Sequence, residues 1–286
     1  MKTTALTLAV VLSGLAPVVT RAEEAQQNHG LLTAIIDDQT GVELAEKHGI
    51  KALSIRDLAG VIKAVLNGDQ PATLIHIAVD DDASDNPIGR LVFQPYLGPK
   101  PPRAPSPTLP MRQLATATEQ YKRDRVVWQK DINAYRQGIV DNANGFIHQV
   151  AATQLQISQR FDDMLAERNG RDFNRSDILG CITVANRLLG KDGRRFLILN
   201  TDAKDLPGKR KPRTTSLTPE ELDPGIELIF VNTSSLPQQE PLFRGIPNKV
   251  HDAPSMKAAL SKVAEMLEAE SPASKSENDA SSKPER

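Results

Sequence analysis

The stretch from Thr73 to Ser84, TLIHIAVDDDAS, constrains the fold of this chain more than any other segment. The run from Leu74 to Val79 is apolar except for His76, and three carboxylates, Asp80 to Asp82, follow it directly. An unbroken aliphatic and β-branched run of this length is typical of a strand buried on both faces of a mainly parallel sheet. Open α/β sheets place their ligand sites at the carboxyl ends of such strands, so the aspartates mark a candidate site.

Further apolar runs alternate with segments of helical spacing, and this alternation predicts an α/β fold. It has a mainly parallel central sheet flanked by helices in three layers. The expected strands are 31–37, 74–79, 88–96, 195–199, 225–231 and a short edge strand at 249–251. The expected helices are 42–47, 55–66, 177–189 with Ser176 as the N-cap, and a final helix that begins after Ser255. Residues 88–96 follow a turn at Asn86-Pro87, so we expect a hairpin with the strand before them.

A long helical segment, 111–169, follows the expected hairpin. A connector with six prolines between Gly98 and Pro110 leads into it. Apolar residues recur every three or four positions along one stripe of this segment: Leu114, Ala117, Tyr121, Trp128, Ile132, Tyr135, Ile139, Ala143, Phe146 and Val150. At 1.5 Å per residue a single helix of this length would span about 85 Å. We therefore expect either a break near Gly138 or Asn144-Gly145, or a helix that projects beyond its domain.

The N-terminus has the layout of a Sec-type signal peptide over residues 1–22. Lys2 precedes an apolar stretch from Ala5 to Val19, and Thr20-Arg21-Ala22 comes before two glutamates. The expected location is therefore periplasmic or secreted, with membrane association only through an uncleaved N-terminus. Residues 23–72 form an N-terminal segment to which the sequence assigns no role. The main domain is expected over 73–268, including the helical insertion 111–169, and a disordered tail over 269–286.

Several features argue against particular functions. The formal net charge is −1 and aromatic residues do not alternate with the basic ones, which disfavours nucleic acid as a partner. Cys181 is the single cysteine and lies on an apolar helical face, as expected of a small buried residue. The basic stretch 209–213 is interpreted as a solvated loop, with an acidic partner surface as the alternative. His76 is interpreted as a core histidine, and standard hydrolase and phosphate-binding motifs are missing from the sequence.

Oxygen-bearing side chains follow several of the expected strands. Because parallel strands end at one edge of a sheet, five such residues are predicted to converge there: Asp80, Asp82, Ser84, Ser176 and Asp202. Carboxylates and hydroxyls of this kind, completed by water, suit Mg²⁺ or another divalent cation.

This arrangement resembles the von Willebrand factor A domain (VWA) with its metal-ion-dependent adhesion site. That family carries Asp-x-Ser-x-Ser after the first strand, a Thr before a later helix, and an Asp after the fourth strand. Here Asp80 to Ser84 is similar to the first element, with Asp82 in place of a Ser, while Ser176 and Asp202 are similar to the other two. The resemblance covers roughly 73–100 and 170–268, and the long helix departs from it. The additional carboxylate leaves open both a bound cation and an ion-free, hydrogen-bonded site.

The signal peptide and the resemblance together predict an exported, bacterial-type protein-binding or assembly module. It would recognise a protein partner at the carboxyl edge of its sheet. The alternative is a metal-dependent hydrolase that uses the same acidic edge, with Asp80 as nucleophile or ligand. A third possibility is a structural domain that acts through the long helix 111–169 and is indifferent to metal.

Overall fold

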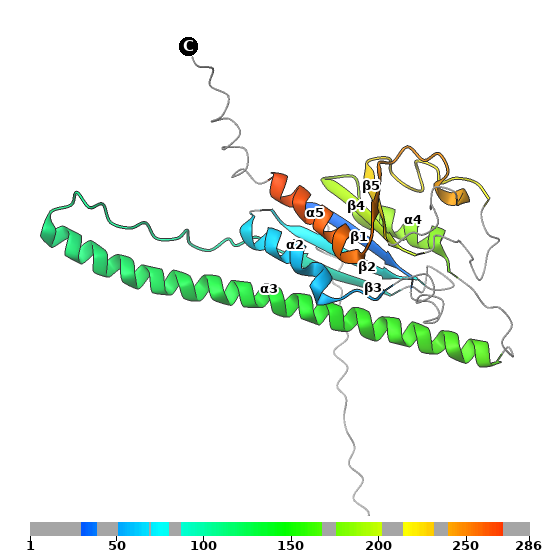
Figure 1. The fold of residues 1–286 in the computed structure, drawn as a ribbon, viewed down its shortest axis with the longest axis horizontal. Coiled ribbons are helices and arrows are strands. Elements are labelled where there is room, and N and C mark those ends of the chain that lie inside the picture. The colour runs from blue at the N-terminus through cyan, green and yellow to red at the C-terminus, as the bar shows by residue number, and fades with distance from the viewer. Residues whose placement is uncertain are drawn as a thin grey trace, which may run out of the picture.

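A computed structural model describes residues 30–38, 51–68, 70–79, 87–167, 176–201, 214–231 and 240–270. In this part of the chain, a six-stranded sheet lies between two layers of helices (Figure 1). The elements in chain order are β1 Leu31–Asp37, α2 Ile55–Asn67, β2 Ala72–Ala78, β3 Ile88–Phe93, α3 Met111–Glu167, α4 Ile178–Leu189, β4 Arg194–Asn200, β5 Ile226–Val231, the 3₁₀ turn η3 Pro241–Phe243, β6 Val250–Ala253 and α5 Met256–Glu270. The predicted α/β class is confirmed.

The strands are ordered β3-β2-β1-β4-β5-β6 across the sheet. All neighbouring strands run parallel except β3, which pairs antiparallel with β2 and forms the predicted hairpin. Strand β1 lies between β2 and β4, and its last residue, Asp37, is level with Ala78 on one side and Asn200 on the other. The carboxyl ends of these three central strands therefore meet at one edge.

Successive side chains of each strand point to opposite faces of the sheet, so the hydrophobic core has one part on each face. Ile35, Leu74 and Ile198 point to the face that α2, α3 and α5 cover. Their chain neighbours, among them Ile36 and Leu199, point to the opposite face, which α4 and the segment around η3 cover. Because both faces are buried, the strands are continuous apolar runs, which is why the sequence shows them clearly.

The long helix α3 is one unbroken element of 57 residues. Its stripe is buried at Ile139, Ala143, Phe146 and Val150, where the helix packs on the β2-β3 side of the sheet. Gly89 of β3 allows this close approach, since a Cβ there would lie 3.2 Å from the ring of Phe146. The first part of the helix extends past the sheet (Figure 1). Of the two expected outcomes, projection is correct and a break is not.

The N-terminal segment contributes directly to the α/β unit. Its strand β1 is central in the sheet, and α2 lies beside α5 on one face (Figure 1). The sheet therefore begins at Leu31, ahead of the boundary at residue 73 that the sequence predicts. The run 74–79 belongs to the second strand of the sheet, whereas the resemblance matches Asp80 to Ser84 to the element that follows the first strand.

The first turn of α4 differs from the prediction. Asp177 is the N-cap, since its carboxylate accepts a hydrogen bond from the backbone N–H of Gly180 at 3.0 Å, and Ser176 is not the cap. Cys181 on the same helix is fully buried, as expected. The predicted helix 42–47, the basic stretch 209–213 and the signal peptide lie outside the described residues. Within the described ranges, no helix combines the length and the apolar character that a membrane span requires.

Candidate functional site

The carboxyl edge of the central strands is where the sequence places its site. Of the five residues predicted to converge, only Ser176 is described; Asp80, Asp82, Ser84 and Asp202 lie outside the described residues. Strands β2 and β4, which precede Asp80 and Asp202, do end at the same edge. Adjacent strands are about 4.8 Å apart, so with β1 between them these two ends are separated by about 10 Å. The residues at the end of β1 occupy the position between them.

Asp37 ends β1 and is 1% exposed. One carboxylate oxygen, Oδ1, accepts a hydrogen bond from Asn200 Nδ2 at 2.7 Å. The other, Oδ2, lies 3.1 Å from His76 Nε2 and accepts a short hydrogen bond from the side-chain amide of Gln154 on α3. Three elements, β2, β4 and α3, thus supply partners to one buried carboxylate. His76 is a buried core histidine with a polar partner, as the sequence predicts.

Asp38, the next residue, is 6% exposed and has a different set of partners. Its Oδ2 accepts a hydrogen bond from the Thr201 hydroxyl at 3.0 Å, and its Oδ1 accepts one from the Ser176 hydroxyl at 3.4 Å. Its backbone N–H donates to the carbonyl of Asn200 at 3.0 Å. Ser176 therefore belongs to the site, but its carboxylate partner is Asp38.

The two adjacent aspartates serve opposite faces of the sheet because side chains alternate along an extended backbone. Asp37 is two residues after Ile35 in the same strand, so both side chains point to the face covered by α2 and α3. There the Gln154 side chain donates to Asp37. Asp38 meets Ser176, which directly precedes α4 on the other face. A single strand end thus organises two polar clusters.

The chemistry of the two clusters differs in the atoms that surround each carboxylate. Around Asp37 the described partner atoms are all side-chain nitrogens, from Asn200, Gln154 and His76. Around Asp38 the described side-chain partners are hydroxyl oxygens, which suit a hard divalent cation completed by water. Within the described ranges, no three or more His, Cys, Asp or Glu side chains are grouped so that they could hold a metal ion. An ion at Asp38 would therefore depend on hydroxyls as well as on the carboxylate.

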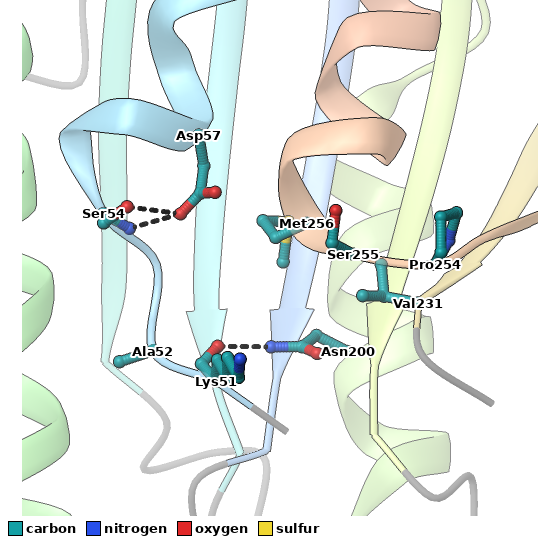
Figure 2. Close-up of a pocket in the computed structure, with 9 residues that line it drawn as sticks. All are labelled: Lys51, Ala52, Ser54, Asp57, Asn200, Val231, Pro254, Ser255 and Met256. Carbon is teal, nitrogen blue, oxygen red and sulfur yellow. Dashed lines mark hydrogen bonds between the residues drawn. The ribbon is translucent and has the colours of Figure 1, made fainter. Parts of the chain in front are cut away.

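A pocket opens beside the Asp37 cluster, on the α2 and α5 face of the sheet. Asn200, which holds Asp37, also lines this pocket. Its amide Nδ2 donates a second hydrogen bond to the carbonyl of Lys51 at 3.1 Å, which ties the segment before α2 to the end of β4 (Figure 2).

Asp37, Asp38, Asn200 and Thr201 are site residues that were not predicted from the sequence. A signal was present, since LLTAIIDD is also an apolar run that ends in carboxylates. It was outweighed by the longer acidic run at Asp80 to Asp82. His76 lies 39 residues from Asp37, and the other side-chain partners described for the two aspartates are 117 to 163 residues away. Local spacing in the sequence does not reveal pairs at such separations.

A scan against protein-family models and a search of curated proteins both find no significant match to this chain.

Proposed function

We propose that this chain is an exported VWA-like binding or assembly module that recognises a protein partner at the carboxyl edge of its sheet. We further propose that a divalent cation such as Mg²⁺ binds there, with Asp38, Ser176 and Thr201 among its ligands. The observation that carries the proposal is the convergence of the Ser176 and Thr201 hydroxyls on the Asp38 carboxylate.

The resemblance stated for the sequence supports this proposal only at Ser176 and Asp202. The family's first element follows the first strand, and the first strand here is β1. That element then corresponds to Asp37 to Gly41, with Gln39 and Gly41 in place of the two serines. Its aspartate falls on Asp37, whereas the proposed ligand is the next residue, Asp38. Ser176 before α4 and Asp202 after the fourth strand keep the roles that the resemblance implies for them. The departures from Ser leave the ion with fewer hydroxyl ligands from this element.

The donor chemistry at Asp38 also supports the proposal. A carboxylate and two hydroxyls supply only oxygen, and a hard cation with several water ligands is commonly bound through one or two carboxylates. A cation with incomplete protein ligation can accept a carboxylate from a partner, which is the kind of recognition that the resemblance implies.

The test is thermal melting of the mature chain in Mg²⁺, in Mn²⁺ and in EDTA, on wild type and on three variants. We expect the metals to raise the melting temperature of wild type, since a ligand that binds only the folded state stabilises it. Asp38→Asn should lose this response. Asp131→Asn, on the exposed surface of α3, is the matched control and should keep it. Asp80→Asn tests whether the acidic run after β2 contributes to the metal response.

Capture of a protein from periplasmic extract or medium, with and without chelator, tests the recognition itself. Capture that is lost with EDTA and with Asp38→Asn supports the proposal. Metal-independent melting together with chelator-insensitive capture would contradict the cation. Phosphate-ester turnover that disappears in Asp80→Asn would instead identify the chain as a hydrolase.

A further inference from the structure

A pocket of about 250 Å³ lies on the α2 and α5 face of the sheet, at the ends of β4 and β5. Figure 2 shows Ser54 and Asp57 on one side, Met256 and Ser255 on the other, and Lys51 and Asn200 at the strand ends below them. The remaining lining residues are Ala52, Val231 and Pro254. A space of this volume accommodates a small metabolite.

Two acceptor oxygens of this pocket have no hydrogen-bond donor among the described residues. Asp57 uses Oδ2 to accept from the backbone N–H and the hydroxyl of Ser54, at 2.8 and 2.6 Å, which leaves Oδ1. Asn200 uses Nδ2 to donate to Asp37 and to the carbonyl of Lys51, and these two bonds define the orientation of its amide. Its Oδ1 is therefore left without a described donor, although Asn200 is only 1% exposed. An acceptor of a pocket residue that has no protein donor can accept a hydrogen bond from a ligand.

Donor groups line other parts of the same pocket. Lys51 has no ion-pair partner among the described residues. The Ser255 hydroxyl accepts from the backbone N–H of Ala258 at 3.2 Å, so its own proton can be donated to a ligand. Ser255 directly precedes α5, a helix of 15 residues whose N-terminus adds a favourable field for an anionic group. This side of the pocket suits a carboxylate.

An apolar wall completes the pocket, formed by Ala52, Val231, Pro254 and Met256. Met256 is a flexible, polarisable side chain that can adapt to aliphatic groups of different shape. The lining thus offers acceptors, donors and an apolar surface together.

We propose that this pocket binds a small zwitterion of the α-amino-acid type with an aliphatic side chain. Its ammonium group donates to Asp57, its carboxylate accepts from Lys51 and Ser255, and its side chain contacts the apolar wall. The proposal does not depend on the cation at Asp38, because none of the groups that hold the zwitterion belongs to that cluster. Asn200 lines this pocket and also donates to Asp37, so it links the two sites.

The experiment is isothermal titration of the full mature chain with L-leucine in EDTA, so that the result is separate from any cation. Two analogues lack one charged group each: 4-methylpentanoate has no ammonium and 3-methylbutylamine has no carboxylate. We expect L-leucine to bind with a Kd of about 1 mM or tighter. Each analogue should bind at least about tenfold more weakly, because it loses one charge-assisted set of hydrogen bonds.

Variants then assign the binding to this pocket. Lys51→Met and Asp57→Asn should each weaken L-leucine binding at least about tenfold. Asp131→Asn is again the matched surface control and should leave the Kd unchanged. Asp57→Asn alters the N-terminal hydrogen bonds of α2, so its melting curve is recorded, whereas exposed Lys51 carries no such complication. Absence of L-leucine binding, equal binding of the analogues, or an unchanged Kd in Lys51→Met would each overturn the proposal.

Discussion

The two ends of the sheet hold their carboxylates in different ways. At the amino ends of β4, β5 and β6, Glu227 forms ion pairs with Lys249 at 3.0 Å and Arg194 at 3.3 Å, and it lies 2.8 Å from His251 Nε2. Close to it, Asp223 pairs with Arg195 at 3.1 Å. At the carboxyl ends, the described partners of Asp37 and Asp38 are amides, hydroxyls and one imidazole.

The cationic partners at the amino ends lower the pKa values of both carboxylates there. Burial raises the pKa of Glu227, but hydrogen bonds from His251, Lys249 and Arg194 outweigh it and lower the pKa to about 2. The hydrogen bond from Arg195 lowers the pKa of Asp223 in the same way. Cationic partners neutralise these carboxylates and join neighbouring strands. The amide and hydroxyl donors described at Asp37 and Asp38 orient these carboxylates and bring no positive charge of their own.

Asp37→Ala, at the carboxyl ends of the strands, is expected to cause the largest loss of stability. It removes the acceptor for the side chains of Asn200, Gln154 and His76, all of them buried, and leaves these polar groups unsatisfied. We expect a loss of about 3–5 kcal/mol in the free energy of unfolding. Urea denaturation with an unchanged m-value is the measurement. A loss below about 1 kcal/mol would show that the network does not hold the strand ends together.

A smaller effect is expected at the amino end, from Glu227→Gln. Charged hydrogen bonds from Arg194, Lys249 and His251 are lost, at a cost of about 2 kcal/mol at pH 7. Because folding lowers the pKa of Glu227 from 4.5 to about 2, its stabilisation is complete above pH 4.5 and disappears as the pH falls towards 2. Urea midpoints of both proteins between pH 7 and pH 2 should converge at the acidic end. A constant difference across that range would contradict the ion-pair interpretation.

Thr201→Val tests the Asp38 cluster with a nearly isosteric change. The variant removes the hydroxyl that donates to Asp38 and should cost about 1 kcal/mol, the usual size of one hydrogen bond. If the cation proposal holds, the variant also weakens the Mg²⁺ response of the melting temperature. Full stability together with an unchanged Mg²⁺ response would remove Thr201 from the site.

The smallest effect is expected from Glu119→Gln on the projecting part of α3. Glu119 pairs with Lys122 at 2.9 Å, and this hydrogen bond lowers its pKa, yet both side chains are exposed. Solvent-exposed pairs of this kind contribute little, so the melting temperature should not change measurably. A clear decrease would indicate that the projecting part of the helix is packed against something in solution.

Much of the fold was predictable because a strand that is buried on both faces is a continuous apolar run in the sequence. The run 195–199 was expected as a strand and is part of β4, and 225–231 likewise corresponds to β5. The helical stripe was expected, and Phe146 and Val150 are buried on it. The hydrophobic periodicity did not show whether the helix continues through Gly138 and Gly145 or breaks near one of them. Isolated glycines cost only about 1 kcal/mol each in a helix, which the packing of its stripe can offset.

The sequence by itself determined the α/β class, most of the strands and the edge at which polar groups gather, since hydrophobic period and strand ends are local properties. Only the tertiary structure decided that β1 is central, that Asp37 and Asp38 face opposite layers, and that Asn200, Gln154, Ser176 and Thr201 meet them. The physical reason is that strand order and side-chain convergence depend on packing between segments more than a hundred residues apart. No local pattern encodes such distances.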